Sequence, residues 1–238
     1  MNGKRLPGDR GASELRAVLF DMDGLLVDSE PVWFEAERSV MARLGGRWTE
    51  ADQEHLIGGS LAYTVGYMRE KAARPADPAV IGGWLMDTMA ALVSGRGVAL
   101  MPGAAGLLAE LAAAGIPRAL VTSSQRRIMD AVLASTGLSF GVTVCAEDVR
   151  RGKPDPEPYL RAAALLGEPP GGCAVLEDSP RGIAAAEAAG CPVLAVPSVP
   201  LPPPPPGRPP RPAAGSLLEV SLARLREVVA GHAGMAGG

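Results

Sequence analysis

The sequence is poor in aromatic residues and has no marked excess of charge. Phe, Trp and Tyr make up 4% of the 238 residues, so the core must rest on Ala, Leu and Val. The net charge of −3 gives no basic surface for nucleic acid or for an anionic membrane, and we expect neither as a partner. A composition that is 47% hydrophobic and 21% charged is typical of a globular chain, either an enzyme or a binding protein.

Long apolar runs, a secretion signal and paired cysteines are also missing. Residues 1–16 mix basic and acidic side chains, and the longest uncharged run, residues 188–207, is interrupted by prolines and cannot form a membrane helix. Cys145, Cys173 and Cys191 form no C-x-x-C pair and show no metal-ligand spacing. Buried or incidental thiols in a reducing compartment explain them best, so we expect a cytoplasmic protein.

Short apolar runs alternate with helical patterns through most of the chain. This alternation predicts βαβ units and therefore an α/β fold with an open, doubly wound, Rossmann-like parallel sheet. The expected strands are residues 15–20, 118–121, 142–145, 173–176 and 193–196, and the expected helices between and after them are residues 103–114, 126–135, 158–166, 180–189 and 217–229.

One region breaks this alternation. Between residues 31 and 98 only helical patterns recur, at 32–44, 61–73 and 80–94, separated by Gly45-Gly46 and Gly58-Gly59 and by prolines between 75 and 78. We expect a helical cap at 31–98 inserted into a catalytic core of residues 15–30 and 99–230. Helices that merely cover one face of the sheet would give the same pattern.

The two ends and one internal segment have compositions of their own. Residues 197–212 hold ten prolines, which predicts an irregular or polyproline loop at 197–215 within the core. Residues 1–14 and 231–238 are expected to be flexible tails.

Polar residues gather where expected strands end. In an open parallel sheet, ligands bind outside the carboxyl ends of the strands. Asp21-Met22-Asp23-Gly24 follows the first strand, Thr122-Ser123-Ser124 the second and Glu177-Asp178-Ser179 the fourth, while Gly152-Lys153-Pro154 lies in a loop before the helix at 158–166. Each group alone has an ordinary explanation as a turn or a helix cap, but the four together predict a site at one rim.

The side chains at this rim suit phosphoryl chemistry. Asp21, Asp23, Glu177 and Asp178 would repel one another unless a divalent cation lay among them, and oxygen ligands without Cys or His favour Mg2+ over zinc. A carboxylate can attack phosphorus to give an aspartyl-phosphate. The metal, a lysine and hydroxyl or N–H donors would neutralise the phosphoryl oxygens.

Lys153 is unusual in this composition. The chain has three lysines against twenty arginines, which suggests that a compact ammonium is required at this position. A chance surface lysine is the alternative. His55 and His232 fall outside the rim, so a site built on histidine is disfavoured.

With these motifs the chain resembles the haloacid dehalogenase-like hydrolase superfamily, in the small helical-cap branch near the β-phosphoglucomutases and sugar phosphatases. The resemblance covers about residues 17–229. It implies that Asp21 is the nucleophile and a metal ligand, and that Asp23 is the acid/base and gives its backbone carbonyl to the metal. It further implies that Thr122 and the N–H of Ser123 hold the phosphate, that Lys153 bridges phosphate and nucleophile, that Asp178 binds Mg2+, and that Glu177 binds it directly or through water. Residues 24–30 would form a flexible flap.

Departures from the family patterns favour one reaction within it. The dehalogenases proper lack the second aspartate, which is Asp23 here. The β-phosphoglucomutases have a histidine where this chain has Trp33, and an arginine after Gly-x-Ser where it has Leu61. Residues 28–33 instead resemble those of bacterial 2-deoxyglucose-6-phosphate and hexitol phosphatases, although Trp33 is equally well explained as a packing residue.

We therefore expect a Mg2+-dependent phosphatase for a small phosphorylated sugar or polyol, acting as a monomer. The alternatives are a β-phosphoglucomutase-like mutase, a phosphonate hydrolase with Lys71 as its Schiff-base lysine, and a non-catalytic binder of phosphorylated metabolites. The last would usually have lost its nucleophile or a metal ligand, and none is lost here.

Overall fold

The centre of the protein is a parallel sheet with five strands in the order β5-β4-β1-β6-β7. The structure is a computed structural model that describes residues 14–56, 60–198, 201 and 211–236. The predicted doubly wound α/β fold is confirmed. The strands are β1 (Ala17–Phe20), β4 (Arg118–Val121), β5 (Val142–Val144), β6 (Cys173–Glu177) and β7 (Val193–Ala195).

Strand β1 determines where a ligand can bind. All four of its residues are buried, and it pairs with β4 on one side and with β6 on the other. After β1 the sheet grows outward through β4 to β5, and the chain then crosses back to add β6 and β7 beyond β1. The crossing makes the carboxyl end of β1 a topological switch point, where open α/β sheets bind their ligands.

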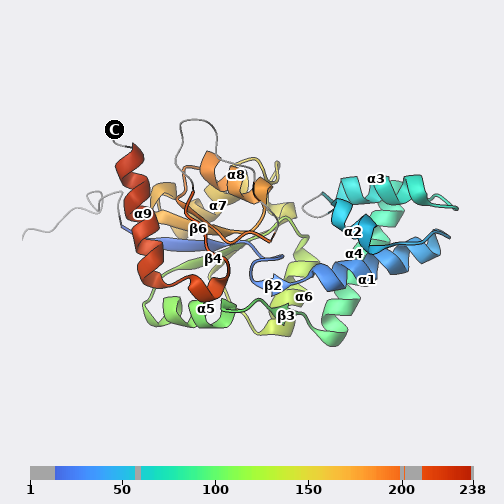
Figure 1. Cartoon of the computed structure of the whole chain (residues 1–238), viewed down its shortest axis with the longest axis horizontal. Helices are drawn as coiled ribbons and strands as arrows, with labels where there is room; N and C mark the ends of the chain where they lie inside the picture. The colour runs from blue at the N-terminus through green and yellow to red at the C-terminus, as the bar shows by residue number, and fades with distance from the viewer. Residues whose placement is uncertain (1–13, 57–59, 199–200, 202–210, 237–238) are drawn as a thin grey trace, which may run out of the picture.

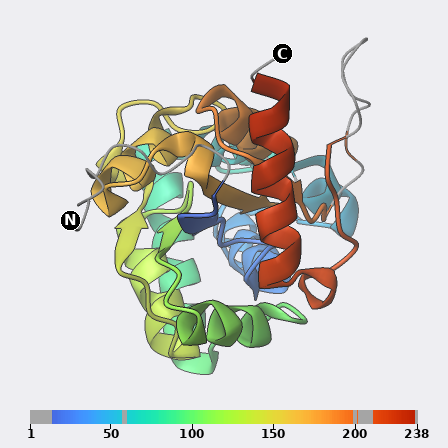
Figure 2. The same cartoon turned by 90° about the vertical axis from the view of Figure 1, so that its left-hand side faces the viewer.

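Helices cover both faces of the sheet because alternate side chains of each strand point to opposite faces. Val18 and Phe20 belong to the cluster that contains Leu107 and Leu225, whereas Ala17 and Leu19 belong to the cluster of α7 and α8. On the first face the beginning of α9 lies next to α5 (Figure 2). The helices are α5 (Ala104–Ala113), α6 (Arg126–Thr136), α7 (Glu157–Leu166), α8 (Pro180–Ala188) and α9 (Leu222–Ala236).

Four further helices form a group beyond one end of the sheet (Figure 1). They are α1 (Glu30–Arg43), α2 (Glu50–Leu56), α3 (Leu61–Lys71) and α4 (Pro78–Arg96). The chain leaves the core through β2 (Val27–Asp28) and returns through β3 (Ala99–Leu100), and these strands pair antiparallel. We call α1–α4 the cap. Helix α4 packs against α6 of the core, where Arg127 forms an ion pair with Asp87.

Several elements differ from the sequence expectations. Helix α2 and the β2–β3 pair were not predicted, because each is too short to show a hydrophobic period. The last expected helix is divided into a 3-10 turn, Leu217–Glu219, and α9. Helix α9 continues to Ala236, so residues 231–236 are helical and the tail expected at 231–238 is wrong for them. The fully buried side chains of Leu225 and Val229 anchor this helix to the core.

The expected proline-rich loop and tail at the N-terminus lie mostly outside the described residues, as do Gly58 and Gly59. Where the chain is described again after the prolines, Pro212 and Ala214 hydrogen-bond with Ala195, so this segment covers the exposed edge of β7. None of the helices in the described part of the chain is both long and apolar enough to cross a membrane.

Two glycines near α5 give a test of this packing. Gly103 has φ +92°, and a β-carbon there would lie 2.4 Å from the backbone nitrogen of Leu218. Gly103→Ala should therefore lower the free energy of unfolding by about 1–3 kcal/mol through left-handed strain, and by more if the chain near Leu218 is displaced. Gly106 lies within α5 with nothing near its β-carbon position, so Gly106→Ala should raise stability by about 0.5–1 kcal/mol. Urea unfolding of both variants measures the difference, and equal effects would contradict the assigned contact.

Candidate active site

A cavity of about 610 Å³ opens between the carboxyl edge of the sheet and the cap. Five of the residues predicted for the site line it: Asp21, Asp23, Ser123, Lys153 and Asp178. The other two, Thr122 and Glu177, are buried just beneath and contact those residues through hydrogen bonds. The four sequence motifs therefore meet in space.

Lys153 lies at the base of the cavity and joins three strands. Its ammonium donates to Asp21 Oδ1 at 2.5 Å, to Glu177 Oε1 at 2.6 Å and to the carbonyl of Val121 at 2.9 Å. Burial disfavours the charged amine, but the negative charges of Asp21 and Glu177 outweigh it and raise the pKa of Lys153 above its usual value. Lys153 is therefore a fixed cation beside the Asp21 carboxylate, and the alternative of a chance surface lysine is excluded.

Glu177 uses both of its carboxylate oxygens within the protein. Oε1 accepts hydrogen bonds from Lys153 and, at 2.7 Å, from the hydroxyl of the fully buried Tyr159. Oε2 accepts from the backbone N–H groups of Asp178 and Ser179 and from the Ser179 hydroxyl at 3.0–3.1 Å, at the N-terminus of α8. A β-carbon at Gly182 would lie 1.7 Å from Glu177 Oε1, so only glycine fits there. Glu177, the last residue of β6, thus fixes both Lys153 and the start of α8.

Three acidic side chains converge at this point. Asp21, Glu177 and Asp178 each offer a carboxylate oxygen, and these atoms lie within 4.8 Å of one another. Burial raises the pKa of Asp21 well above its usual value and raises the pKa of Asp178 to about 7. The negative charges of the neighbouring carboxylates raise both pKa values further. Three buried carboxylates against one lysine leave excess negative charge, which a divalent cation with oxygen ligands would neutralise. The residues present therefore fit a metal site.

Asp23 lies in a different environment, among hydroxyl groups. Its Oδ1 accepts from Ser29 at 2.8 Å, and its Oδ2 accepts from Ser124 at 2.8 Å and from Thr122 at 3.3 Å. Asp23 is half-buried and its side chain is not part of the acidic group of Asp21, Glu177 and Asp178. Sequence reasoning missed Ser29 and the role of Ser124 at this carboxylate, although both stand within or next to the quoted motifs.

Gly24 allows the chain to turn tightly after these aspartates. It has φ +80°, and its N–H donates to the carbonyl of Val27. A β-carbon at this position would lie 2.3 Å from Asp178 Oδ2. The glycine of the Asp-x-Asp-Gly motif is therefore required both by its backbone conformation and by the close approach of the acidic side chain.

The cap supplies the opposite wall of the cavity. Trp33 lines it and also packs against the hydrophobic core, so it is a packing residue, and its contact with a substrate stays a prediction. Glu30 belongs to the segment 28–33 that the family resemblance singled out, but no pattern in the sequence pointed to Glu37, Gln53, Thr64 or Met86 on the same wall.

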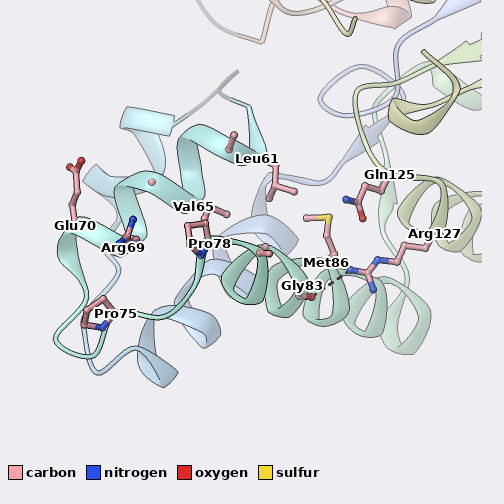
Figure 3. Close-up of a pocket in the computed structure, with 14 residues that line it drawn as sticks. Leu61, Val65, Arg69, Glu70, Pro75, Pro78, Gly83, Met86, Gln125 and Arg127 are labelled. Carbon is pink, nitrogen blue, oxygen red and sulfur yellow. Dashed lines mark hydrogen bonds between the residues drawn. The ribbon is translucent and has the colours of Figure 1, made fainter. Parts of the chain in front are cut away.

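A second cavity of about 940 Å³ adjoins the first between α3, α4 and α6. Leu61, Met86 and Gln125 line both cavities. In Figure 3, Met86 of α4 and Gln125 of the core face the same gap, and Arg127 reaches toward Gly83. The two cavities are therefore neighbours in the region between cap and core, with these three side chains between them.

Comparisons with known proteins agree with this site. A model of haloacid dehalogenase-like hydrolases matches residues 15–190. Hexitol phosphatase A of Escherichia coli is 39% identical over 184 residues, which cover 76% of this chain and 82% of that protein. Protein CbbY of Rhodobacter capsulatus is 32% identical over 196 residues, covering 78% and 86% of the two chains.

A solved structure shares the whole architecture. A mutant of CbbY from Rhodobacter sphaeroides, in complex with xylulose-(1,5)bisphosphate, superposes with a TM-score of 0.78 at 27% identity, and the match covers 89% of this chain and 99% of that one. The family match spans β1 through α8, the segment that carries all four motifs. The chain belongs to the haloacid dehalogenase-like hydrolases.

Proposed function

We propose that this protein is a Mg2+-dependent phosphatase that hydrolyses a small sugar or polyol monophosphate through an aspartyl-phosphate, and that it acts in the cytoplasm. The observation that carries the proposal is the contact of the Lys153 ammonium with Asp21 Oδ1 at the base of the cavity. A carboxylate held against a fixed cation, with Asp23 beside it in the same cavity, has the partners that nucleophilic phosphoryl transfer requires.

In this proposal Asp21 attacks phosphorus with a carboxylate oxygen while the bond from phosphorus to the alcohol oxygen breaks. Asp23 donates its proton to that leaving oxygen, and the alcohol departs. Asp23 then takes a proton from water, whose oxygen attacks phosphorus, releases inorganic phosphate and regenerates the Asp21 carboxylate. The hydroxyls of Ser29, Ser124 and Thr122 hold the Asp23 carboxylate in one orientation for both proton transfers.

The phosphoryl oxygens would be bound by Lys153 and the backbone N–H of Ser123. Thr122 differs from the expectation in one respect, because its hydroxyl oxygen already accepts the N–H of Ser124 and its proton points to Asp23. Asp21, Asp178 and the backbone carbonyl of Asp23 would hold Mg2+, which when bound neutralises phosphoryl charge. Since both oxygens of Glu177 already accept protein donors, its part in metal binding is indirect.

Two features of the cap favour a phosphatase over the alternative enzymes. Trp33 and Leu61 line the cavity at positions where the mutases carry a histidine and an arginine, so neither position offers a cation to a second phosphate. Lys71, the cap lysine that a phosphonate hydrolase would need, is not among the lining residues and is bound to Asp52 and stacked near Tyr67. The similarity to hexitol phosphatase A supports a polyol or sugar phosphate as substrate.

Replacement of the nucleophile tests the mechanism. Asp21→Asn should lower kcat for phosphate release by at least about a thousandfold, because an amide cannot form the covalent intermediate. The variant should remain folded, because Lys153 keeps its ion pair with Glu177 and is not left as an unpaired buried charge. Asp130→Asn, on the exposed face of α6, is the matched control and should retain full activity. Appreciable Mg2+-dependent turnover by Asp21→Asn would sink the assignment.

Metal binding can be tested separately from activity. Mg2+ should raise the melting temperature of the protein, because an ion that binds only the folded state stabilises it in proportion to the logarithm of its concentration. EDTA should reverse the shift and abolish phosphate release. Asp178→Asn should lose most of the Mg2+-dependent shift, whereas Asp130→Asn should retain it. An unchanged shift in Asp178→Asn would place the metal elsewhere.

A further inference from the structure

The cap side of the active-site cavity carries polar groups that the proposed chemistry does not use. Glu30 and Glu37 of α1 and Gln53 of α2 line this wall, and we call these three residues the acceptor group. Resting on the proposed function, we propose that the acceptor group, and Glu37 above all, selects a leaving group that carries several uncharged hydroxyls and rejects one with a second phosphate.

Helix geometry places the acids on one face. Glu30, Trp33 and Glu37 are separated by three and four residues, so their side chains lie above one another on the same side of α1. All three line the cavity. An aromatic ring between two carboxylates is suited to a carbohydrate, because its face packs on C–H groups while the acids accept O–H donors.

Gln53 has an acceptor without a partner. Its Nε2 donates to Glu30 Oε2 at 2.9 Å, which fixes the amide orientation, because the reverse orientation would set its oxygen against a carboxylate. The other atom, Oε1, is buried and has no hydrogen-bond partner among the described residues. A buried amide oxygen left without a donor costs stability unless a ligand or water supplies one.

Glu37 is also buried and has one oxygen that accepts no hydrogen bond from a side chain of the described chain. Its side chain is 4% exposed, and Oε2 accepts from Trp48 Nε1 at 3.0 Å. Within the described chain, Oε1 receives no hydrogen bond from another side chain, and the residue lines the cavity. Burial, with a smaller contribution from the charge of Glu30, raises the pKa of Glu37 to about 7. The structure thus holds a desolvated carboxyl where glutamine would fit without that penalty, which is typical of a functional site.

Charge on the two sides of the cavity determines what the leaving group can be. The basic side chains that line it, Lys153 and Arg181, both belong to the core. Among the described residues, the cap contributes two carboxyls and no basic side chain to the same lining. A second phosphate placed against Glu30 and Glu37 would be repelled by them, whereas hydroxyls donate to these groups.

The test compares Glu37→Gln with wild type on three phosphate esters: a hexitol monophosphate, a hexitol bisphosphate and p-nitrophenyl phosphate, which has no hydroxyl tail. Wild type should prefer the monophosphate to the bisphosphate. In Glu37→Gln, kcat/KM for the hexitol monophosphate should fall about tenfold relative to that for p-nitrophenyl phosphate, because a charged acceptor is lost. The discrimination against the bisphosphate should fall as well.

The thermal stability of Glu37→Gln and a control variant separate this effect from damage to the fold. Because the folded protein raises the pKa of Glu37 from 4.5 to about 7, the stability of wild type falls as the pH rises through this range. The Glu37→Gln variant has no carboxyl here and does not lose this stability. The melting temperature of Glu37→Gln should therefore exceed that of wild type at pH of about 8. Glu227→Gln, at an exposed acid of α9 that lines neither cavity, is the control and should change neither the melting temperature nor the ratio of the kcat/KM values.

The possible failures are distinguishable. If wild type hydrolyses none of the three esters with Mg2+, the proposed function fails. Hydrolysis by wild type with an equal effect of Glu37→Gln on all three esters would overturn the acceptor group alone. A preference for an aminohexitol phosphate over the hexitol phosphate, lost in Glu37→Gln, would show that the wall binds an ammonium instead. Gln53→Leu, which removes the unpartnered oxygen, should show the same selective loss as Glu37→Gln.

Discussion

The buried ammonium of Lys153 is the group on which the rest of the site depends. It comes from the loop before α7 and binds an aspartate at the end of β1, a carbonyl at the end of β4 and a glutamate at the end of β6. Three neighbouring strands of the sheet are thus joined by one charge, at the place where the strand order reverses. Without this cation, Asp21, Glu177 and Asp178 would be three desolvated carboxylates without an ion pair among the described residues, and at least one would bind a proton. Lys153 therefore favours the ionised form of Asp21, against the burial that raises the pKa of this carboxyl, and in the proposed function it would also bind phosphate.

Glu177 connects the Lys153 ammonium to the elements around the site. With five donors on two oxygens, it couples Lys153 and Tyr159 to the N-terminus of α8. The arrangement leaves no room for a side chain at Gly182, one turn into that helix. The family resemblance assigns Glu177 to the metal, but in this structure its hydrogen bonds fix the positions of Lys153 and of the start of α8. In the proposed function the direct metal ligands would then be the carboxylates that line the cavity, Asp21 and Asp178.

The sequence predicted the core well and the cap poorly, for physical reasons. Strands such as β4 and β6 are buried on both faces and appear as apolar runs, and the parallel fold places polar residues at their carboxyl ends on one rim. Asp21, Ser123, Lys153 and Asp178 could be found in this way without tertiary information. The acceptor group could not, because Gln53 lies on α2, a seven-residue helix with no periodic signal, and meets Glu30 across 23 positions of sequence. Likewise, nothing in residues 24–30 showed that the Ser29 hydroxyl binds Asp23. Hydrogen bonds between side chains of separate elements depend on packing, which a single sequence does not show.

The two sides of the cavity differ in charge, with basic side chains on the core side and carboxyls on the cap side. In the proposed function, Lys153 and the metal site on the core side would attract the phosphate that all substrates share. On the cap side, Glu30, Glu37 and Gln53 line the cavity, and these three residues offer hydrogen-bond acceptors but no positive charge. Because the two sides of the cavity favour opposite charges, the proposed substrate, a monophosphate with a neutral tail, would bind in only one direction, with phosphorus next to Asp21. The carboxyl of Glu37 lowers stability at neutral pH, and this loss of stability is consistent with a group that orients the substrate before reaction. Specificity and orientation would then have the same physical origin, the separation of positive charge on the sheet from negative charge on the cap.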